Sequence, residues 1–318
     1  MNLAPLSTKI RVVFAGSPAF ALPSLRSLHQ CPWLELVAVY TQPDRIAGRG
    51  QKLRQSAVKS FALANSLPVE QPTSWKMPET IARFEAYRPD ILLVAAYGVI
   101  LPALALRAPV LGALNVHASL LPRWRGAAPI QRALMAGDKL TGVTIMRVVP
   151  ALDAGPILHR TEYPITAQDT AGSVTDQLAS LGAAALLGVL EQLRDGPLAG
   201  RPQNEQDATY ATKITRADRE LDWTRSAVAL ERQTRALFPA PLAFTETLGL
   251  PVNVLESMVT GHLTNTPPGT ILKVDPAGID IATAEGGLRL LMIQPLGKRA
   301  MTVKDFLNGY GQRITCGR

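Results

Sequence analysis

Short, mostly apolar runs separated by helix-like stretches constrain the fold of this chain more than any other feature of the sequence. Five such runs fall in its first half, at Ile10–Ala15, Leu36–Thr41, Ile91–Ala96, Leu111–His117 and Gly142–Val149. Runs of this length without regular polar alternation are typical of strands buried on both faces of a parallel sheet. Because helical patterns lie between them, we expect an α/β fold with a Rossmann-like, open and mainly parallel sheet.

The pattern changes towards the second half of the chain. An amphipathic stretch at Thr170–Leu193 predicts a long covering helix, and the polar residues 197–209 predict a linker. Beyond it, a helical stretch at Ser226–Leu237 is followed by short alternating runs, as expected for a small β-barrel. We therefore expect one domain over residues 1–196 and a second over residues 210–318.

The turn after the first run resembles the start of a dinucleotide-binding unit. It reads Gly16-Ser17-Pro18, however, which is not Gly-x-Gly-x-x-Gly. The next run leads into Gln42-Pro43-Asp44 and has no acidic residue in the usual ribose-binding position. We therefore expect the same kind of fold without NAD as a cofactor.

Composition limits the classes of partner and compartment. The formal net charge of +8 and the pI near 9.7 favour a polyanionic partner. Cys31 and Cys316 lie far apart and the histidines do not cluster, so we expect no metal site and a reducing compartment. No signal-like segment or uninterrupted apolar run of membrane-spanning length occurs. We expect a soluble cytoplasmic protein that contacts no membrane and is a monomer.

The end of the fourth run carries the first candidate catalytic residues. Asn115 and His117 are two residues apart, so their side chains leave a strand on the same face. A carboxamide gives a fixed hydrogen-bond donor, and an imidazole takes or gives a proton near neutral pH. Pro122 and Gly126 then force a loop at this strand end, where open α/β sheets place their chemistry.

A carboxylate is expected beside this pair. Asp153 follows the run Gly142–Val149, and it meets Asn115 and His117 if both strands end at the same edge of one sheet. Asn115 and protonated His117 would then steady the oxyanion of a tetrahedral intermediate. Asp153 would hold the imidazole and help to move protons. The three residues predict acyl transfer without a covalent intermediate.

The string Asn-x-His-x-Ser-Leu-Leu-Pro, followed by Asp153, resembles the signature of the 10-formyltetrahydrofolate-dependent formyltransferases. The similarity extends from Ile10 to about Asp305, and Thr41–Leu53 and Ser119–Gln131 are most similar to the members that act on tRNA. The resemblance implies 10-formyltetrahydrofolate as co-substrate and the α-amino group of methionine on the initiator tRNA as acceptor. It also implies an OB-like, tRNA-binding C-terminal domain. The residues that it places around the folate are Ser119, Leu120, Leu121 and Pro122.

A basic segment between Thr41 and Ser60 carries five basic residues against one acid, Asp44. Its glycines and prolines are compatible with a mobile solvated loop, or with a phosphate-binding loop that folds against an RNA end. The resemblance favours the second interpretation, because the tRNA-specific members carry a similar loop. The expected tRNA contacts are Arg45, Arg49 and Lys52, and in the C-terminal domain Lys298 and Arg299, for which a solvated turn is the alternative.

Two other functions would use parts of the same sequence. A formyltransferase for a purine precursor or an amino sugar, or a formyltetrahydrofolate hydrolase, would share Asn115, His117 and Asp153. Such enzymes need neither the basic segment nor the C-terminal barrel. A non-catalytic RNA-binding protein would need the basic segment but not the three catalytic candidates.

Overall fold

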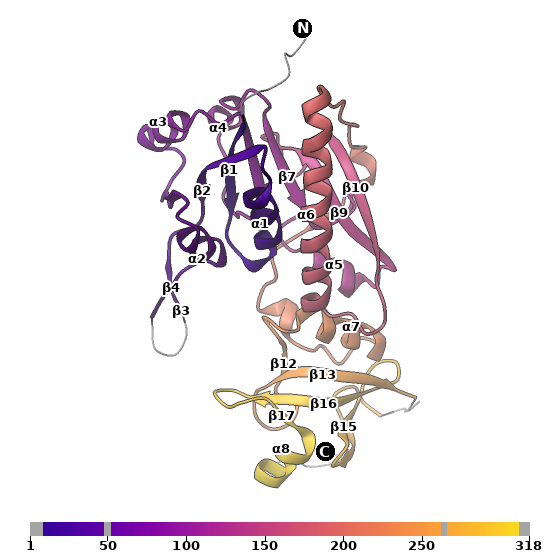
Figure 1. Ribbon diagram of the computed structural model, residues 1–318. Helices are drawn as coiled ribbons and strands as arrows, with labels where there is room; N and C mark the ends of the chain where they lie inside the picture. Colours follow the sequence, from indigo (N-terminus) through magenta and orange to yellow (C-terminus); the bar gives the residue numbers. More distant parts are fainter. Residues whose placement is uncertain (1–8, 48–51, 262–265, 312–318) are drawn as a thin grey trace. The chain divides into compact units, whose positions relative to one another are not determined.

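The chain forms two compact units in the computed structural model, which describes residues 9–47, 52–261 and 266–311 (Figure 1). Unit 1 consists of Met1–Pro129, Leu140–Pro164 and Thr175–Ala211. Unit 2 consists of Ile130–Lys139, Ile165–Val174 and Thr212–Arg318. Two short segments that precede residue 175 therefore belong to unit 2 together with the C-terminal part of the chain. The predicted site residue Arg49 and the cysteine Cys316 lie outside the described residues.

A seven-stranded sheet forms the centre of unit 1, in the order β10-β9-β7-β6-β1-β2-β5. Its strands are β1 (Ile10–Gly16), β2 (Leu34–Tyr40), β5 (Val69–Glu70), β6 (Ile91–Ala95), β7 (Ala113–His117), β9 (Leu140–Arg147) and β10 (Ile157–Pro164). The five strands from β5 to β7 pair in parallel, whereas β9 runs antiparallel to both β7 and β10. The prediction of an α/β fold with a Rossmann-like, mainly parallel sheet is confirmed.

Helices join the strands of unit 1 and cover the sheet. They are η1 (Ala19–Ala21), α1 (Leu22–Gln30), α2 (Ala57–Ala64), α3 (Pro78–Ala86), α4 (Ala103–Arg107), α6 (Ala171–Asp195, from Thr175 onward) and η2 (Glu205–Asp207). Proline occupies the first turn of α1 and of α3, where a missing N–H group removes no helical hydrogen bond. Ser56 caps α2, because its Oγ accepts from the Lys59 N–H at 3.0 Å.

The longest helix, α6, runs along the sheet beside β7, β9 and β10 (Figure 1). Its Gly182 permits this close approach, since a Cβ atom there would lie 2.7 Å from Val116 Cγ1. Among the described helices, α6 alone is long and apolar enough to cross a membrane by length and composition. Of its most apolar 18-residue window, 44% is buried in the structure. That burial is what a covering helix of an α/β sheet requires.

Unit 2 is built on an antiparallel sheet in the order β12-β13-β16-β15-β14, with β17 paired to β16. Its strands are β12 (Ala243–Thr245), β13 (Val252–Thr260), β14 (Ile271–Asp275), β15 (Gly278–Ala282), β16 (Gly287–Pro295) and β17 (Met301–Thr302). Its helices are α5 (Pro129–Ala136, from Ile130 onward), η3 (Ala217–Arg219), α7 (Ala227–Leu237) and α8 (Val303–Tyr310). Leu230 and Leu237 of α7 and Phe306 of α8 are fully buried against it. The prediction of a small β domain after the α/β domain is confirmed.

The polar residues 197–209, predicted to be a linker, are bonded to unit 1. Ile157 and Arg201 exchange backbone hydrogen bonds of 2.8 Å, and Thr209 donates its N–H to the Pro122 carbonyl at 3.3 Å. Directly after them, β11 (Tyr210–Ala211) pairs in parallel with β8 (Arg125–Gly126). This segment therefore forms one wall of the region where Asn115 and His117 lie.

Candidate active site

β7 presents the two residues of the Asn-x-His pair on one face. In the ladder, Asn115 lies opposite Val94 of β6 and Met146 of β9, and His117 lies opposite Thr144. His117 is buried, at 6% exposure, and Asn115 is half-buried. Within the described part of the chain, the Asn115 carboxamide has no hydrogen-bond partner. Its N–H₂ group is therefore available to a ligand.

The His117 ring is fixed from one side by backbone. Its Nε2 lies 3.0 Å from the carbonyl oxygen of Trp124. Because a carbonyl oxygen only accepts hydrogen bonds, Nε2 must carry a hydrogen, and the neutral ring then has its lone pair on Nδ1. Nδ1 is therefore the ring atom that can exchange a proton.

Asp153 faces this atom. Its Oδ2 lies 3.6 Å from His117 Nδ1, too far for a hydrogen bond but within ion-pair range when the ring is protonated. The same oxygen accepts the Gly126 N–H at 2.9 Å. Both side chains are largely shielded from solvent, with 7% of His117 and 15% of Asp153 exposed. The structure thus brings all three predicted catalytic residues into one region of unit 1.

The route by which Asp153 reaches this position differs from the expected one. We expected the strands before His117 and Asp153 to end at the same edge, but β9 is antiparallel to β7 and ends beside Leu114. The loop after β9 then folds back. A bond from the Arg147 N–H to the Pro156 carbonyl, 2.9 Å long, closes this loop. The expectation of a shared edge is therefore wrong, although the pairing of the side chains is present.

Two residues of the site have left-handed backbone. Asp153 has φ 47° and Trp124 has φ 64°. This region costs a residue other than glycine about 1–2 kcal/mol, so the surroundings must hold both residues in place. The Trp124 ring stacks under the Arg123 guanidinium, whose Cζ lies 4.5 Å from the ring centroid. The backbone carbonyl of Trp124 faces Nε2 of His117.

A buried arginine connects the loop after β7 to residues 197–209. Arg125 is 2% exposed, and its Nη1 and Nη2 each donate a hydrogen bond of 2.8 Å to the Glu205 carboxylate. Its Nε donates to Gln203 Oε1 at 3.0 Å. The hydrogen bond to Glu205 raises the pKa of Arg125, and the same bond lowers the pKa of Glu205. Sequence reasoning missed Gln203 and Glu205, because a polar stretch of this composition is also typical of a linker.

The predicted folate segment lies at the start of the loop after β7. Ser119 and Leu121 are fully buried, and the Ser119 Oγ donates to the Arg123 carbonyl at 2.6 Å. Leu120 and Pro122 are half-buried. Ser119 and Leu121 thus fix the shape of the segment, and the side chains of Leu120 and Pro122 are partly accessible.

The predicted basic loop is built on a hairpin. β3 (Arg45–Ala47) and β4 (Lys52–Arg54) pair antiparallel (Figure 1), so its base is regular and not an irregular loop. Arg45 is exposed, and its Nη2 donates to Gln42 Oε1 at 2.7 Å.

A polar network anchors the chain next to this hairpin. Lys59 Nζ donates to Asp44 Oδ2 at 2.6 Å and to Gln71 Oε1 at 2.7 Å. The hydrogen bond from Lys59 lowers the pKa of Asp44. Lys59, one of the five basic residues of the segment, is therefore engaged within unit 1.

The predicted tRNA contacts of the C-terminal domain lie in unit 2. Lys298 and Arg299 are exposed in the turn after β16, where the Lys298 N–H donates to the Pro295 carbonyl at 3.0 Å.

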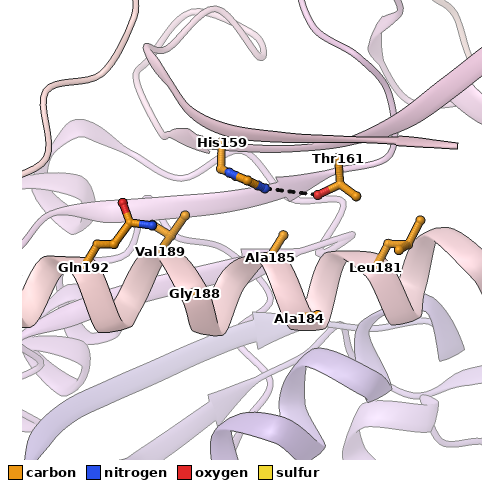
Figure 2. Close-up of a pocket in the computed structure, with 8 residues that line it drawn as sticks. All are labelled: His159, Thr161, Leu181, Ala184, Ala185, Gly188, Val189 and Gln192. Atoms are coloured by element: carbon orange, nitrogen blue, oxygen red, sulfur yellow. Dashed lines mark hydrogen bonds between the residues drawn. The ribbon is translucent and has the colours of Figure 1, made fainter.

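A pocket lies on the other face of the sheet from Asn115 and His117. It is an open pocket with a volume of about 280 Å³, lined by residues of β10 and α6 (Figure 2). His159 Nε2 and Thr161 Oγ1 lie 3.2 Å apart on its strand side, and small and apolar residues of α6 form its floor. Because α6 contacts Val116, which points away from the face of Asn115 and His117, this pocket is separate from the candidate active site.

No group of three or more histidine, cysteine or acidic side chains that could bind a metal ion occurs in the ranges that the structure describes.

Comparisons with protein families match both units. A formyl transferase model matches residues 8–190, and a model of the formyl transferase C-terminal domain matches residues 213–311. The methionyl-tRNA formyltransferase of Nitrosococcus oceani is 49% identical over 300 residues, covering 94% of this chain and 93% of the relative. That of Methylococcus capsulatus is 48% identical over 308 residues, covering 96% and 99%.

Solved structures of lower identity share the fold. HypX from Aquifex aeolicus in complex with tetrahydrofolic acid matches with a TM-score of 0.65 at 16% identity, over 98% of this chain and 49% of that one. An N-formyltransferase from Helicobacter canadensis, solved with folinic acid and dTDP-3-aminofucose, matches with a TM-score of 0.64 at 16% identity, over 90% and 98%.

Proposed function

Because the chain belongs to the formyl transferase family, we propose that it transfers a formyl group from 10-formyltetrahydrofolate to the α-amino group of methionine on the initiator tRNA. One observation carries this proposal. Asn115, His117 and Asp153 converge in a chain that matches methionyl-tRNA formyltransferases over nearly its whole length. The proposal requires neither a membrane nor a second copy, because all three residues come from unit 1 of one chain.

The reaction joins the neutral amine nitrogen to the formyl carbon. The new C–N bond places negative charge on the formyl oxygen, giving a tetrahedral intermediate. The bond between this carbon and N10 of the folate then breaks, N10 takes up a proton, and the amine nitrogen loses one. The products are formylmethionyl-tRNA and tetrahydrofolate, and no covalent bond to the enzyme forms.

The side chains of the site supply the oxyanion donors and the proton acceptor. The free N–H₂ group of Asn115 and the Nδ1–H of protonated His117 would donate to the oxyanion. Trp124 keeps the opposite ring nitrogen occupied, so the donating atom of His117 is defined. Asp153, 3.6 Å from Nδ1, would pair with the protonated ring and receive the amine proton directly or through a water.

The two substrates would lie on opposite sides of the formyl group. The tetrahydrofolate part would contact the segment Ser119–Pro122 through Leu120 and Pro122 and through its backbone. The tRNA end would contact Arg45 of the hairpin, together with Arg49 and Lys52. In unit 2 the exposed Lys298 and Arg299 would contact phosphates elsewhere on the tRNA.

The test is turnover of His117→Ala with the complete substrates. General acid–base and oxyanion groups each contribute about 10²–10⁴-fold, so we expect kcat to fall by about 10³-fold. The dissociation constant for methionyl-tRNA should stay within about two-fold, because phosphate contacts supply most of the affinity for nucleic acid. Wild-type turnover in this variant would contradict the catalytic assignment.

A further inference from the structure

Asp153 depends on its surroundings more than the other two catalytic residues do. Asn115 and His117 lie in a strand with paired neighbours on both sides, whereas Asp153 lies in a turn with left-handed backbone. The two residues before it, Ala151 and Leu152, are exposed. The direction of its carboxylate is therefore set by whatever holds the backbone of this turn.

The side chain of Gln203 holds the backbone of this turn. Its Nε2 donates one hydrogen to the Asp153 carbonyl at 2.7 Å and the other to the Gly155 carbonyl at 2.8 Å. The amide thus bridges the two ends of the three-residue stretch that contains Asp153. Its orientation is unambiguous, because a flipped amide would direct its oxygen at two carbonyl oxygens.

The other half of the amide is also engaged. Gln203 Oε1 accepts from Arg125 Nε, and the same guanidinium is held by Glu205. The residue after Arg125, Gly126, donates its N–H to the Asp153 carboxylate itself. Arg125 therefore holds Asp153 along two paths, from its side chain through Gln203 and from its backbone through Gly126.

The segment that carries Gln203 is itself fixed. Arg201 pairs with Ile157, and Tyr210 pairs with Arg125 in the β8–β11 ladder. Gln203 thus projects from a backbone that is bonded on one side to the start of β10 and on the other to the loop after β7. A side chain that only filled space would need neither the two donors nor this double attachment.

We propose that Gln203 is a positioning residue that holds the carboxylate of Asp153 against Nδ1 of His117. The inference rests on the proposed function only in calling Asp153 catalytic. The geometric statement, that Gln203 acts on His117 through Asp153, can be tested without turnover.

The His117 ring gives the direct readout. The ¹⁵N shifts of a histidine ring report the tautomer and the hydrogen bonding of each nitrogen, and the chain has four histidines, so His117→Asn assigns the signals. Asp153→Asn provides the reference change. Gln203→Met removes all three hydrogen bonds at similar volume and should reproduce at least half of that change. The matched control Gln206→Met, three residues along the same segment and exposed, should leave the signals unchanged.

A second substitution at the same position keeps the test valid if Gln203→Met disturbs the local fold. Gln203→Glu keeps an acceptor for Arg125 but turns oxygen towards the two carbonyls, so it should shift the His117 signals in the same direction. In the formyl-transfer assay, both variants should lower kcat about 10- to 100-fold, as displacements of about 1 Å do. The KM values for the folate donor and for methionyl-tRNA should change less than about two-fold, since the Gln203 amide is engaged by Arg125, Asp153 and Gly155 and is assigned no substrate contact.

Unchanged ring signals in both Gln203 variants would overturn the inference, whether or not turnover falls. Altered ring signals with wild-type kcat would overturn it as well, since the position of Asp153 would then not matter to the reaction. Failure of the wild-type protein to formylate methionyl-tRNA is a different result. It would remove the proposed function, and the ring signals would still decide whether Gln203 positions Asp153.

Discussion

Replacing Gly155 by alanine should displace the catalytic loop by an amount that the structure defines. A Cβ atom on Gly155 would lie 1.8 Å from the Arg147 carbonyl oxygen and 2.9 Å from its carbonyl carbon. Contacts of a Cβ atom under 3.0 Å essentially never occur, so the two must separate by at least the difference, 1.2 Å. Both contacts are with backbone, so no side chain can relieve them.

The displacement should reach Asp153, which is two residues away in the same turn. Its carboxylate oxygen accepts the Gly126 N–H at 2.9 Å, and a shift of this size breaks such a bond. A misplacement of about 1 Å at a catalytic group costs about 10²-fold in rate. We therefore expect kcat of Gly155→Ala to fall about 100-fold, while KM for both substrates changes less than about two-fold.

The matched control is Gly188→Ala in α6, where an added Cβ meets no atom within 4 Å. Alanine in a helix is favoured over glycine by about 1 kcal/mol, so this variant should be at least as stable as wild type and fully active. Initial-rate formyl transfer and thermal unfolding of both variants are the assay. Wild-type kcat in Gly155→Ala would refute the reasoning that the Asp153 turn is held rigidly against the backbone after β9.

Three further results are expected. The hydrogen bond from Arg132 is the main cause that lowers the pKa of Asp218 from 3.8 to about 2. Above pH 4 Asp218 therefore contributes at most about 2 kcal/mol to the free energy of unfolding, and this contribution is lost as the pH falls through 2. Asp218→Asn should therefore lower the urea-unfolding free energy of unit 2 at pH 6 but not near pH 2, and an equal loss at both would contradict this. Arg289→Met should lower the free energy of unfolding by about 3–5 kcal/mol, because it removes the guanidinium from the Asp280 carboxylate, which is 1% exposed. In chemical unfolding, the double variant that also carries Asp280→Asn should recover part of this loss. Arg45→Ala should weaken tRNA binding and lower the slope of log K against log salt by about 1, and an unchanged slope would remove Arg45 from the tRNA contacts.

The regular parts of the fold could be predicted from the sequence because burial leaves a local pattern. The apolar run Ile91–Ala96 became β6 within one residue, and the helical spacing of Thr170–Leu193 became α6. The common face of Asn115 and His117 follows from the two-residue period of a strand, which holds in any sheet.

The direction of β9 could not be predicted in this way. A buried strand has the same apolar composition whether it pairs in parallel or antiparallel, so Gly142–Val149 fitted both arrangements. The pairing of His117 with Asp153 was expected from the wrong geometry, a shared strand edge. It depends instead on a folded-back loop that the hydrogen bond between the Arg147 N–H and the Pro156 carbonyl closes. Within this loop Gly155 lies against the Arg147 carbonyl, a contact that only the structure shows.

The role of residues 197–209 was hidden for a different reason. Glutamine and glutamate in a polar stretch are typical of solvated linkers, and their hydrogen-bond partners are far away along the chain. Gln203 bonds Asp153 fifty residues before it, and Glu205 bonds Arg125 eighty residues before it. No local pattern records contacts of that separation, whereas in the structure the buried Arg125 guanidinium bonds both Gln203 and Glu205.

The most direct test of the account is the identity of the formylated product. Wild-type protein would be incubated with 10-formyltetrahydrofolate labelled in the formyl group and three competing acceptors, which are methionyl initiator tRNA, an amino-sugar nucleotide and water. The account predicts that the label appears on the α-amino group of methionyl-tRNA, and that His117→Ala loses this transfer. Label on the sugar amine, or released as formate with methionyl-tRNA left unmodified, would contradict it.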